Sequence, residues 1–466
     1  MDNDAIRSDG LRVYPQVDFN ADSDVSAGLP LSDTLLRCTF DGTFASGPPA
    51  SSTLIQSMTT HSTMDEKPFL SRVVLKNYKS IAACAVDLCP LTFLIGPNGS
   101  GKSNFLDALR FTTDSLRGSL DKALRDRGGI AEVRRRSGGH PTHFGVRMEF
   151  QLGSSVGHYA FQIAARPKGG YEVQTEECVI RGPESARFLV RAGAVQEVEF
   201  SGMRNSIVAP AAAKDRLYLV HASGVPAFRP VYEALSSMGF YSINPDMIRD
   251  LQAPGSGDLL VRDGSNLTSV LRQLAERDDA GKRRIEEYLS SIVPGVTGVD
   301  VREVPPKATL EFRQEVAGSS DPWRLLAGNM SDGTLRALGI LVALFQGSNV
   351  ALVGIEEPEV ALHPAAVGAL RDALREASHS TQVIVTTHSP DLLDSADIDV
   401  ELFLAVYAEK GATKIAPVDE ASREAVHKGL YTPGELLRLD QLRPAAPATR
   451  LYGGTRSLPL FDAAGQ

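Results

Sequence analysis

Residues 96–103 read Gly-Pro-Asn-Gly-Ser-Gly-Lys-Ser and fit the phosphate-loop pattern GxxxxGK[ST]. Glycines in such a loop let the backbone wrap around phosphates, and the start of the following helix adds its dipole. We expect Lys102 to neutralise the β- and γ-phosphates of ATP and the Ser103 hydroxyl to hold Mg²⁺. An ordinary glycine turn before a helix is the alternative, and Lys102-Ser103 weighs against it. The expected ATP contacts are Gly96, Pro97, Asn98, Gly99, Ser100, Gly101, Lys102, Ser103 and Asn104.

A second candidate element is the segment 351–358, Ala-Leu-Val-Gly-Ile-Glu-Glu-Pro. An apolar strand that ends in two carboxylates delivers acid to the edge of a parallel sheet where ligands bind. We expect Glu356 to bind Mg²⁺ through water and Glu357 to orient and deprotonate the attacking water. Taken alone, the pair is equally compatible with a solvated acidic turn.

Two further segments are weaker signals by themselves. Ser331-Asp332-Gly333-Thr334 opens an apolar helix, and a serine cap followed by glycine exposes backbone amides that can bind an anion. His388 follows the apolar run 382–387, where a lone histidine is more often a structural residue. The four segments together are a stronger signal than each alone. The phosphate loop, the serine-glycine helix start, the acidic strand and the histidine strand follow one another along the chain in the order that an ATPase site of this kind needs.

The elements that must position these residues are read from hydrophobic periodicity. We expect a strand at 91–95 before the loop and a helix at 104–117 after it. Alternating apolar residues then predict antiparallel strands from 146 to 200, and residues 205–290 read as mainly helical. A helix at 335–345, a strand at 350–355, a helix at 365–377 and a strand at 382–386 complete an α/β pattern.

The expected fold class is therefore α/β: a P-loop NTPase with a mostly parallel sheet, an antiparallel β subdomain and a helical insertion. The expected parts are a disordered tail at 1–63, with Met64 the expected translation start; a first ATPase lobe at 64–204; a mainly helical insertion at 205–320; a second ATPase lobe at 321–440; and a flexible tail at 441–466.

Composition narrows the class of protein. With 466 residues and 42% hydrophobic content, the chain can bury a sizeable core, and it lacks an apolar run long enough to span a membrane. It also lacks the start of a secretory signal, so we expect a cytoplasmic protein with no membrane partner. Its four cysteines form no CxxC pair, which indicates neither a zinc knuckle nor a disulfide framework.

Charge is distributed unevenly along the chain. The formal net charge is -9, yet residues 117–136 contain seven basic and three acidic residues. This basic stretch is a candidate contact for DNA phosphates, with Arg134, Arg135 and Arg136 as its densest part. The interleaved acids leave a solvated helix face as an equal alternative.

The motifs together resemble the RecF-like, SMC-related ATPases, a branch of the ABC class with an AAA-type ATP-binding domain. The resemblance spans about residues 70–440 and is strongest at the nucleotide motifs. The segments that carry it are LKNYKSI (75–81), LIGPNGSGKSNFLDALRF (94–111), GSNL (264–267), MSDGTLRALGI (330–340), IEEPEVALHP (355–364) and QVIVTTHSPDLLD (382–394).

This resemblance implies an ABC-type ATPase head and a homodimer that forms on binding ATP. It implies that Ser331, Asp332, Gly333 and Thr334 form a signature acting in trans on the partner's γ-phosphate, which His388 senses. Lys102, Glu357 and His388 would then be the catalytic set.

The chain departs from the family pattern in several places. Asp332 replaces a glycine that is usual in transporters, which favours the DNA-associated branch. No long coiled coil separates loop and signature, and only 78 residues follow His388, fewer than a separate nuclease domain commonly takes. The glutamine loop of the family is not placed by the sequence, and Gln151, at the end of an expected strand, is one candidate for it.

Two functions remain open at this point. One is a DNA-repair ATPase like RecF that clamps DNA as an ATP-bound dimer. The other is an ATPase sensor or regulatory subunit of a phage-defence or toxin system, working with a separate nuclease. A transporter subunit is a distant third.

Overall fold

The computed structural model describes residues 69–137, 141–201, 210–347, 350–395, 398–445 and 459–461. The expected disordered tail at 1–63 and the expected start at Met64 lie outside the described residues.

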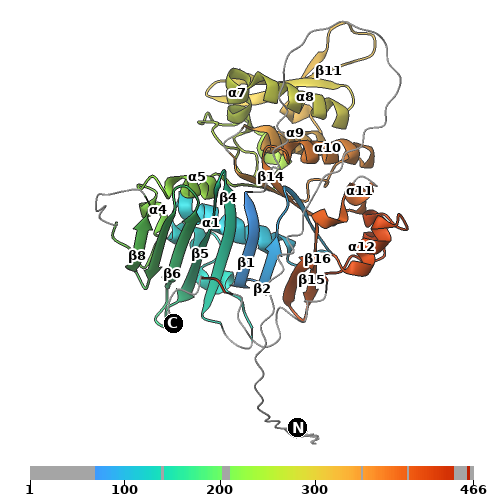
Figure 1. Cartoon of the computed structure of the whole chain (residues 1–466). Helices are drawn as coiled ribbons and strands as arrows, with labels where there is room; N and C mark the ends of the chain where they lie inside the picture. Colours follow the sequence, from blue (N-terminus) through green and yellow to red (C-terminus); the bar gives the residue numbers. More distant parts are fainter. Residues whose placement is uncertain are drawn as a thin grey trace, which may run out of the picture. The chain divides into compact units, whose positions relative to one another are not determined.

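One large sheet organises the described part of the chain (Figure 1). Its strands lie in the order β8-β7-β6-β5-β4-β1-β2-β16-β15-β3-β14-β13-β9. They are β1 (Leu70–Tyr78), β2 (Ile81–Asp87), β3 (Leu91–Ile95), β4 (His143–Leu152), β5 (Ser155–Ala165), β6 (Tyr171–Arg181), β7 (Ala186–Arg191), β8 (Ala194–Phe200), β9 (Gly239–Tyr241), β13 (Leu352–Glu356), β14 (Gln382–Thr387), β15 (Phe403–Glu409) and β16 (Ala412–Pro417).

Five neighbouring strands of this sheet, β15-β3-β14-β13-β9, are parallel. Every residue of β3 and β14 is buried, as expected for strands covered on both faces. Parallel strands end at a common edge, so the residues that follow β3, β13 and β14 are brought together there. This edge carries the candidate site.

The sheet separates two hydrophobic cores, because side chains alternate between its faces. Phe93 belongs to one core, together with the helices at 332–345 and 367–377. Its ring packs edge to face against that of Phe403, with the ring centroids 5.7 Å apart. Its neighbour Leu94 points the other way, into the core formed with the helix after the phosphate loop. The helices on that second face are α1 (Lys102–Arg117), α2 (Leu120–Arg125), α3 (Ile130–Val133), α4 (Leu219–Ala222) and α5 (Arg229–Ser237).

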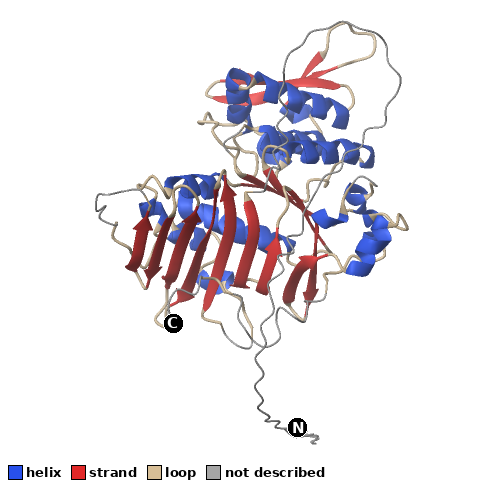
Figure 2. Ribbon diagram, in the orientation of Figure 1, coloured by secondary structure: helices blue, strands red, loops and turns tan. Residues whose placement is uncertain are grey.

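The antiparallel strands β4–β8 continue the large sheet through β1, as the side-by-side strands in Figure 2 show. The expected α/β fold class is confirmed: β3, the phosphate-loop sequence and α1 follow one another, and β3 lies among the parallel strands. The expected antiparallel β subdomain is the part of this sheet formed by β4–β8.

The insertion after β8 differs from the expected mainly helical segment. It contains helices α6 (Pro245–Arg249), α7 (Leu267–Arg277) and α8 (Asp279–Ile292), but also strand β9, which joins the edge of the large sheet. A second sheet, β10 (Val296–Val304), β11 (Lys307–Gln314) and β12 (Trp323–Leu326), ends the insertion. Its buried Leu310 and Phe312 share a core with Leu289 of α8.

The last part of the chain carries helices before, between and after the strands β13–β16. These helices are α9 (Asp332–Phe345), which precedes β13, and then α10 (Val367–Ala377), α11 (Pro390–Leu393), α12 (Glu420–His427) and α13 (Pro433–Arg438), with 3-10 turns at Ala327–Asn329, Pro364–Ala366 and Val400–Leu402.

The expected flexible tail at 441–466 is corrected where the structure describes it. Pro444 forms a bridge with Val418 of the segment after β16. Leu460 is buried, and its carbonyl accepts a hydrogen bond from Arg147 of β4 at 3.2 Å.

A buried carboxylate ties the antiparallel strands to α4. Glu176 accepts hydrogen bonds from the hydroxyl of Tyr159 at 2.9 Å and from the amides of Tyr218 and Leu219 at the start of α4. Burial raises the pKa of the Glu176 carboxyl to about 7, although these hydrogen bonds oppose the shift. The folded protein therefore holds this proton more tightly than the unfolded chain does.

This raised pKa predicts that the contribution of Glu176 to stability is lost as pH rises. An acid paired with a cation usually shows the opposite trend, because its contribution is lost as pH falls. The contribution of Glu176 is present below the ordinary carboxyl pKa of 4.5 and is lost as pH rises through about 7. The unfolding free energy of wild type, measured relative to Glu176→Gln by urea titration, should fall by about 3 kcal/mol between pH 4 and 8. The half-exposed Glu172→Gln on the same strand should show no such trend. A constant difference between wild type and Glu176→Gln would contradict the assignment.

Candidate functional site

The phosphate loop joins β3 to α1 and needs its glycines. Gly96 and Gly101 have φ angles of 154° and 105°. A Cβ on Gly96 would lie 2.1 Å from the carbonyl oxygen of Val406, and one on Gly101 would lie 2.1 Å from Oγ1 of Thr413. The loop is therefore packed directly against β15 and β16, where only glycine fits.

A chain of hydroxyl groups holds the loop from the β16 side. Thr413 Oγ1 donates to the carbonyl of Ser100 at 2.8 Å and pairs with Ser80 Oγ at 2.7 Å. Ser80 Oγ in turn accepts from the side-chain amide of Asn104 at 2.6 Å. Ser80 lies in the turn between β1 and β2, so the segment 75–81 quoted above contributes to the shape of the loop.

Lys102 is buried at the first position of α1. Its ammonium donates to the carbonyls of Gly96 at 2.7 Å and Pro97 at 3.2 Å, which are groups of the loop itself. Burial lowers the pKa of Lys102, while the charges of Glu357 and Glu359 oppose that shift. The two acids are therefore close enough to act on the lysine of the loop.

The two candidate acids stand at the end of β13. Glu356 lines a cleft together with Ser103, so a hydroxyl and a carboxylate oxygen, both suited to Mg²⁺, face the same space. Glu357 has a left-handed backbone, with φ of 46°, and its amide donates to the carbonyl of Thr386 at 2.9 Å. A non-glycine residue held in this region is a recurrent feature of functional sites.

His388 meets Glu357 at this edge. The distance from His388 Nδ1 to Glu357 Oε1 is 3.2 Å, and both side chains remain accessible to solvent. The histidine strand and the acidic strand thus place their candidate residues in direct contact, 31 residues apart in the chain.

A third acid of the same motif was missed in the sequence. Glu359 is buried and accepts a hydrogen bond from Thr387 Oγ1 at 2.5 Å, while its Oε2 is buried without a hydrogen-bond partner. It stands two positions after Glu357 in IEEPEV, so the run of acids was the available signal. Its place beside Thr387 links the acidic turn to the end of β14.

The Ser-Asp-Gly-Thr segment forms the start of α9. Ser331 is its N-cap, accepting from the Thr334 amide at 3.2 Å. A Cβ on Gly333 would lie 2.4 Å from the carbonyl oxygen of Ala361, so the helix start packs against the turn that follows the acids. Asp332 forms an ion pair with Arg249 of α6.

An arginine of α9 joins this segment to the acids. Arg336 donates to the carbonyl of Glu357 at 3.0 Å and to that of Ile243 at 3.2 Å. Burial lowers the pKa of Arg336, and Glu359 and Glu357 oppose the shift. One guanidinium therefore connects the signature segment, the acidic turn and the residues after β9.

The basic stretch 117–136 differs from the expected open DNA surface. Arg134 donates to the carbonyl of Pro141, and Arg135 donates to that of Ser80. Arg136 is exposed but forms an ion pair with Glu132. Two of the three arginines of the candidate patch are thus used to hold local structure.

The deepest arginine of the stretch is Arg127, whose side chain is 3% exposed. It bridges Asp107 of α1 at 3.0 Å and Asp114 at 2.8 Å. Burial alone would raise the pKa of Asp107, but Arg127, Lys79 and Arg110 lower it to about 2. These charges form an internal cluster beside the site.

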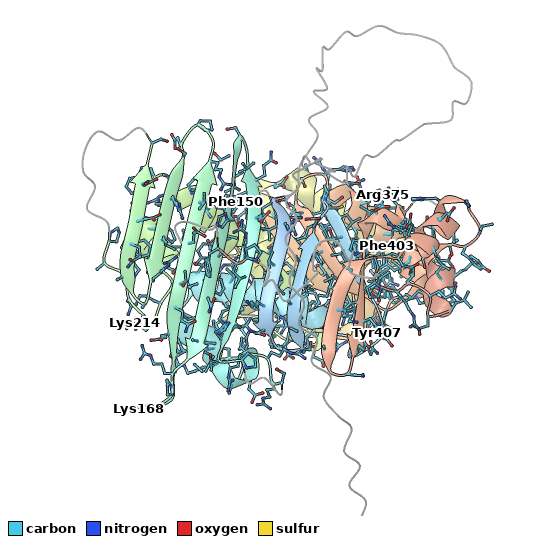
Figure 3. The ribbon with its side chains drawn as sticks, turned by 60° about the horizontal axis from the view of Figure 1, so that its bottom comes forward. Phe150, Lys168, Lys214, Arg375, Phe403 and Tyr407 are labelled. Carbon is cyan, nitrogen blue, oxygen red and sulfur yellow. The ribbon has the colours of Figure 1, made fainter. Side chains whose placement is uncertain are left out.

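Gln151, the candidate for the glutamine loop, lies away from the phosphate loop. The backbone amide of Gln151 donates a hydrogen bond to the carbonyl of Phe69. The backbone amide of the adjacent Leu70 donates to the side-chain oxygen of Gln382, the first residue of β14. Figure 3 shows Phe150 and Phe403 toward one end of the sheet and Tyr407, farther along β15, toward the other. Gln151 therefore lies at the amino ends of the parallel strands, whereas the phosphate loop is at their carboxyl ends.

Membrane-spanning helices and all-protein metal sites are both absent from the described ranges. No helix there is long and apolar enough to cross a membrane. No group of three or more histidine, cysteine or acidic side chains within those ranges could hold a metal by itself. A Mg²⁺ ion held by Ser103 and Glu356 would rely on phosphate and water for its other ligands, as is usual for this ion.

Two family models match separate parts of the chain. Residues 69–138 match "AAA ATPase domain", and residues 258–394 match "AAA domain, putative AbiEii toxin, Type IV TA system". The first match contains the phosphate loop, and the second contains the signature segment, the acids and His388.

The sequence alignments with individual proteins cover a short segment, whereas the structural alignments cover most of the chain. The DNA replication and repair proteins RecF of Vibrio campbellii and Vibrio vulnificus are 49% identical over 41 residues, 9% of this chain and 12% or 11% of theirs. An SMC head bound to the C-winged helix domain of ScpA aligns with a TM-score of 0.49 at 16% identity, over 76% of this chain and 99% of that one. The SMC head domain from Thermotoga maritima aligns with 0.40 at 16% identity, over 75% and 99%.

The phosphate loop at the edge of the sheet and the two matched AAA domain models support an ATPase with an AAA-type ATP-binding domain. In sequence it is similar to RecF over a short segment, in line with the resemblance of its motifs.

Proposed function

We propose that this ATPase hydrolyses ATP with Mg²⁺ at the carboxyl edge of β3, β13 and β14. The observation that carries the proposal is the 3.2 Å contact between His388 and Glu357, next to the phosphate loop. A general base must lie within hydrogen-bond reach of the group that orients it, and this pair meets that condition. The direct test is release of phosphate from ATP with and without Mg²⁺.

Each residue has a distinct part in the proposed reaction. The loop amides and Lys102 bind the phosphates, and Lys102 exchanges its carbonyl partners for phosphate oxygens. Ser103 and, through water, Glu356 would hold Mg²⁺, which would supply positive charge to neutralise the phosphates of ATP. Glu357 takes the proton of the attacking water, and His388 positions the carboxylate that accepts it.

We also propose that two copies close face to face on ATP. The amides at the start of α9, capped by Ser331, form an anion site. In the closed dimer they would contact the γ-phosphate bound by the other copy, as the family resemblance implies. Packing of Gly333 against the acidic turn supports this, because it fixes the helix start relative to the catalytic residues of its own copy.

For the cellular role, we propose that the ATP-bound dimer acts on DNA, in repair or recombination. The support is the short segment of 41 residues that is 49% identical to the DNA replication and repair protein RecF. Because Arg134 and Arg135 bond to the protein itself, we propose the exposed positions of the same stretch as the contacts: Lys122, Arg125 and Arg136.

This assignment predicts the effect of reversing charge at Lys122, Arg125 and Arg136 together. Affinity for duplex DNA should fall for all sequences, and the slope of log K against log salt should flatten by about 0.9 for each phosphate that the variant no longer neutralises. Arg283→Glu is the control, because Arg283 is exposed and pairs with an acid four residues away, as Arg125 does. Fluorescence anisotropy at several salt concentrations measures both quantities.

The alternative role is that of an ATPase sensor or regulatory subunit working with a separate nuclease or other effector. The match of residues 258–394 to the AbiEii-type domain favours it, and so does the engagement of Arg134 and Arg135 with the protein itself. Unchanged DNA affinity and salt slope in the charge-reversal variant would support this role over the first.

A further inference from the structure

A tight turn of the insertion reaches the acidic edge of the sheet. The amide of Ser242 donates to the carbonyl of Arg262 at 3.0 Å, and the amide of Asn244 donates to that of Asp263 at 3.1 Å. Ser242 follows directly after β9, the strand that pairs with the acidic strand β13. The turn is thus attached by its backbone beside the candidate catalytic residues.

The motif Gly264-Ser-Asn-Leu267, to which the proposed reaction gives no part, builds this turn. Asn266 accepts from the amide of Val261 at 2.8 Å and donates to the carbonyl of Leu259 at 2.9 Å. Gly264 has φ of 84°, and a Cβ there would lie 2.9 Å from Ile248. The motif therefore fixes the backbone on both sides of Arg262.

Arg262 is the side chain that this turn presents to the site. Its Nη2 donates to Glu356 Oε1 at 2.6 Å, and both residues line the cleft that contains Ser103. The Arg262 side chain lines the cleft and is 45% exposed, so the protein does not enclose it. A guanidinium has five N–H donors in a planar fork, and Glu356 accepts from one nitrogen.

We infer that Arg262 binds the terminal phosphate of ATP, so that the insertion supplies a cation for the γ-phosphate within the same copy. The inference rests on the proposed function, which places Ser103 and Glu356 beside Mg²⁺. Mg²⁺ held there would neutralise the terminal phosphates, so a cation paired with Glu356 would lie close to the γ-phosphate. Arginine suits this place because its fork matches phosphate oxygens while keeping its carboxylate partner.

The site should consequently distinguish ATP from ADP through Arg262. Lys102 and the loop amides also contact the β-phosphate, which both nucleotides possess, whereas Arg262 would contact only the phosphate that hydrolysis removes. A charge-assisted hydrogen bond to phosphate is stronger than a neutral one, so its loss should be measurable in binding.

The experiment measures binding of mant-ATP and mant-ADP by fluorescence, in EDTA, to wild type, Arg262→Gln and Arg272→Gln. Arg272 pairs with Glu303 elsewhere on the insertion and controls for the loss of an ion pair. We expect Arg262→Gln to lose about tenfold in ATP affinity and less than about twofold in ADP affinity. Arg272→Gln should match wild type for both nucleotides.

Other outcomes overturn the inference. Equal losses for ATP and ADP would mean that Arg262 only holds the turn in place, and unchanged binding of both would mean that it does not reach the phosphate. Arg262→Lys should keep part of the preference for ATP, because it keeps the charge but not the fork. A wild-type protein that binds neither nucleotide would instead refute the proposed function.

Discussion

Lys102→Ala is expected to bind ATP at least about tenfold more weakly than wild type and to release no phosphate above background. The ammonium is the fixed cation of the loop, and the loop amides alone cannot balance the charge of two phosphates. In the structure, the ammonium of Lys102 donates hydrogen bonds to the carbonyl oxygens of Gly96 at 2.7 Å and Pro97 at 3.2 Å. Because these partners are neutral, phosphate oxygens should replace them readily.

The control for this variant must separate loss of charge from loss of fold. Lys282→Ala removes a lysine that pairs with Asp300 in the insertion, and it should bind and hydrolyse ATP as wild type does. Both variants should melt within a few degrees of wild type, since each loses the polar contacts of a single ammonium group. A Lys102→Ala protein with wild-type turnover would refute the site.

The parts of the site that could be predicted are those encoded in short segments. The phosphate loop specifies its own turn, since its glycines stand where β15 and β16 leave no room for a side chain. The acids of β13 and His388 after β14 come together because parallel strands share an edge, which the apolar runs already indicated. Roles for these residues remain proposals, although their proximity follows from the fold.

What could not be predicted depends on partners distant in the chain. Arg127 looked like a surface charge, yet it is buried against Asp107 and Asp114 of α1. Arg262 gave no signal, because its partner Glu356 is 94 positions away. In both cases the local sequence is polar, and only the folded arrangement decides whether a charge faces solvent or another charge.

The short strand β9 was missed for a related reason. It is three residues long, Gly239–Tyr241, and lies within a segment of helical character. Pairing with β13 makes it a strand, which is a tertiary effect that periodicity cannot reveal in so few residues. The same strand leads into the segment that holds Arg262, so missing it also hid that residue.

The second prediction of large effect concerns Glu357→Gln. The amide keeps the shape of the side chain and loses the base, so ATP should bind while turnover falls to background. The bound γ-phosphate then persists, and in the face-to-face arrangement it joins the two copies. We expect this variant to accumulate as an ATP-dependent dimer in sedimentation velocity with ATP and Mg²⁺, and to remain monomeric with ADP.

A substitution at Ser331 in the Glu357→Gln background tests whether the signature acts in trans. Ser331→Arg puts a bulky side chain at the anion site but also removes the cap of α9, so Ser331→Asp is the matched variant. Aspartate keeps a capping oxygen and places negative charge against the partner's phosphate. Both double variants should bind ATP as monomers. A Glu357→Gln protein that stays monomeric at saturating ATP, or a double variant that still dimerises, would refute the face-to-face arrangement while leaving the ATPase assignment intact.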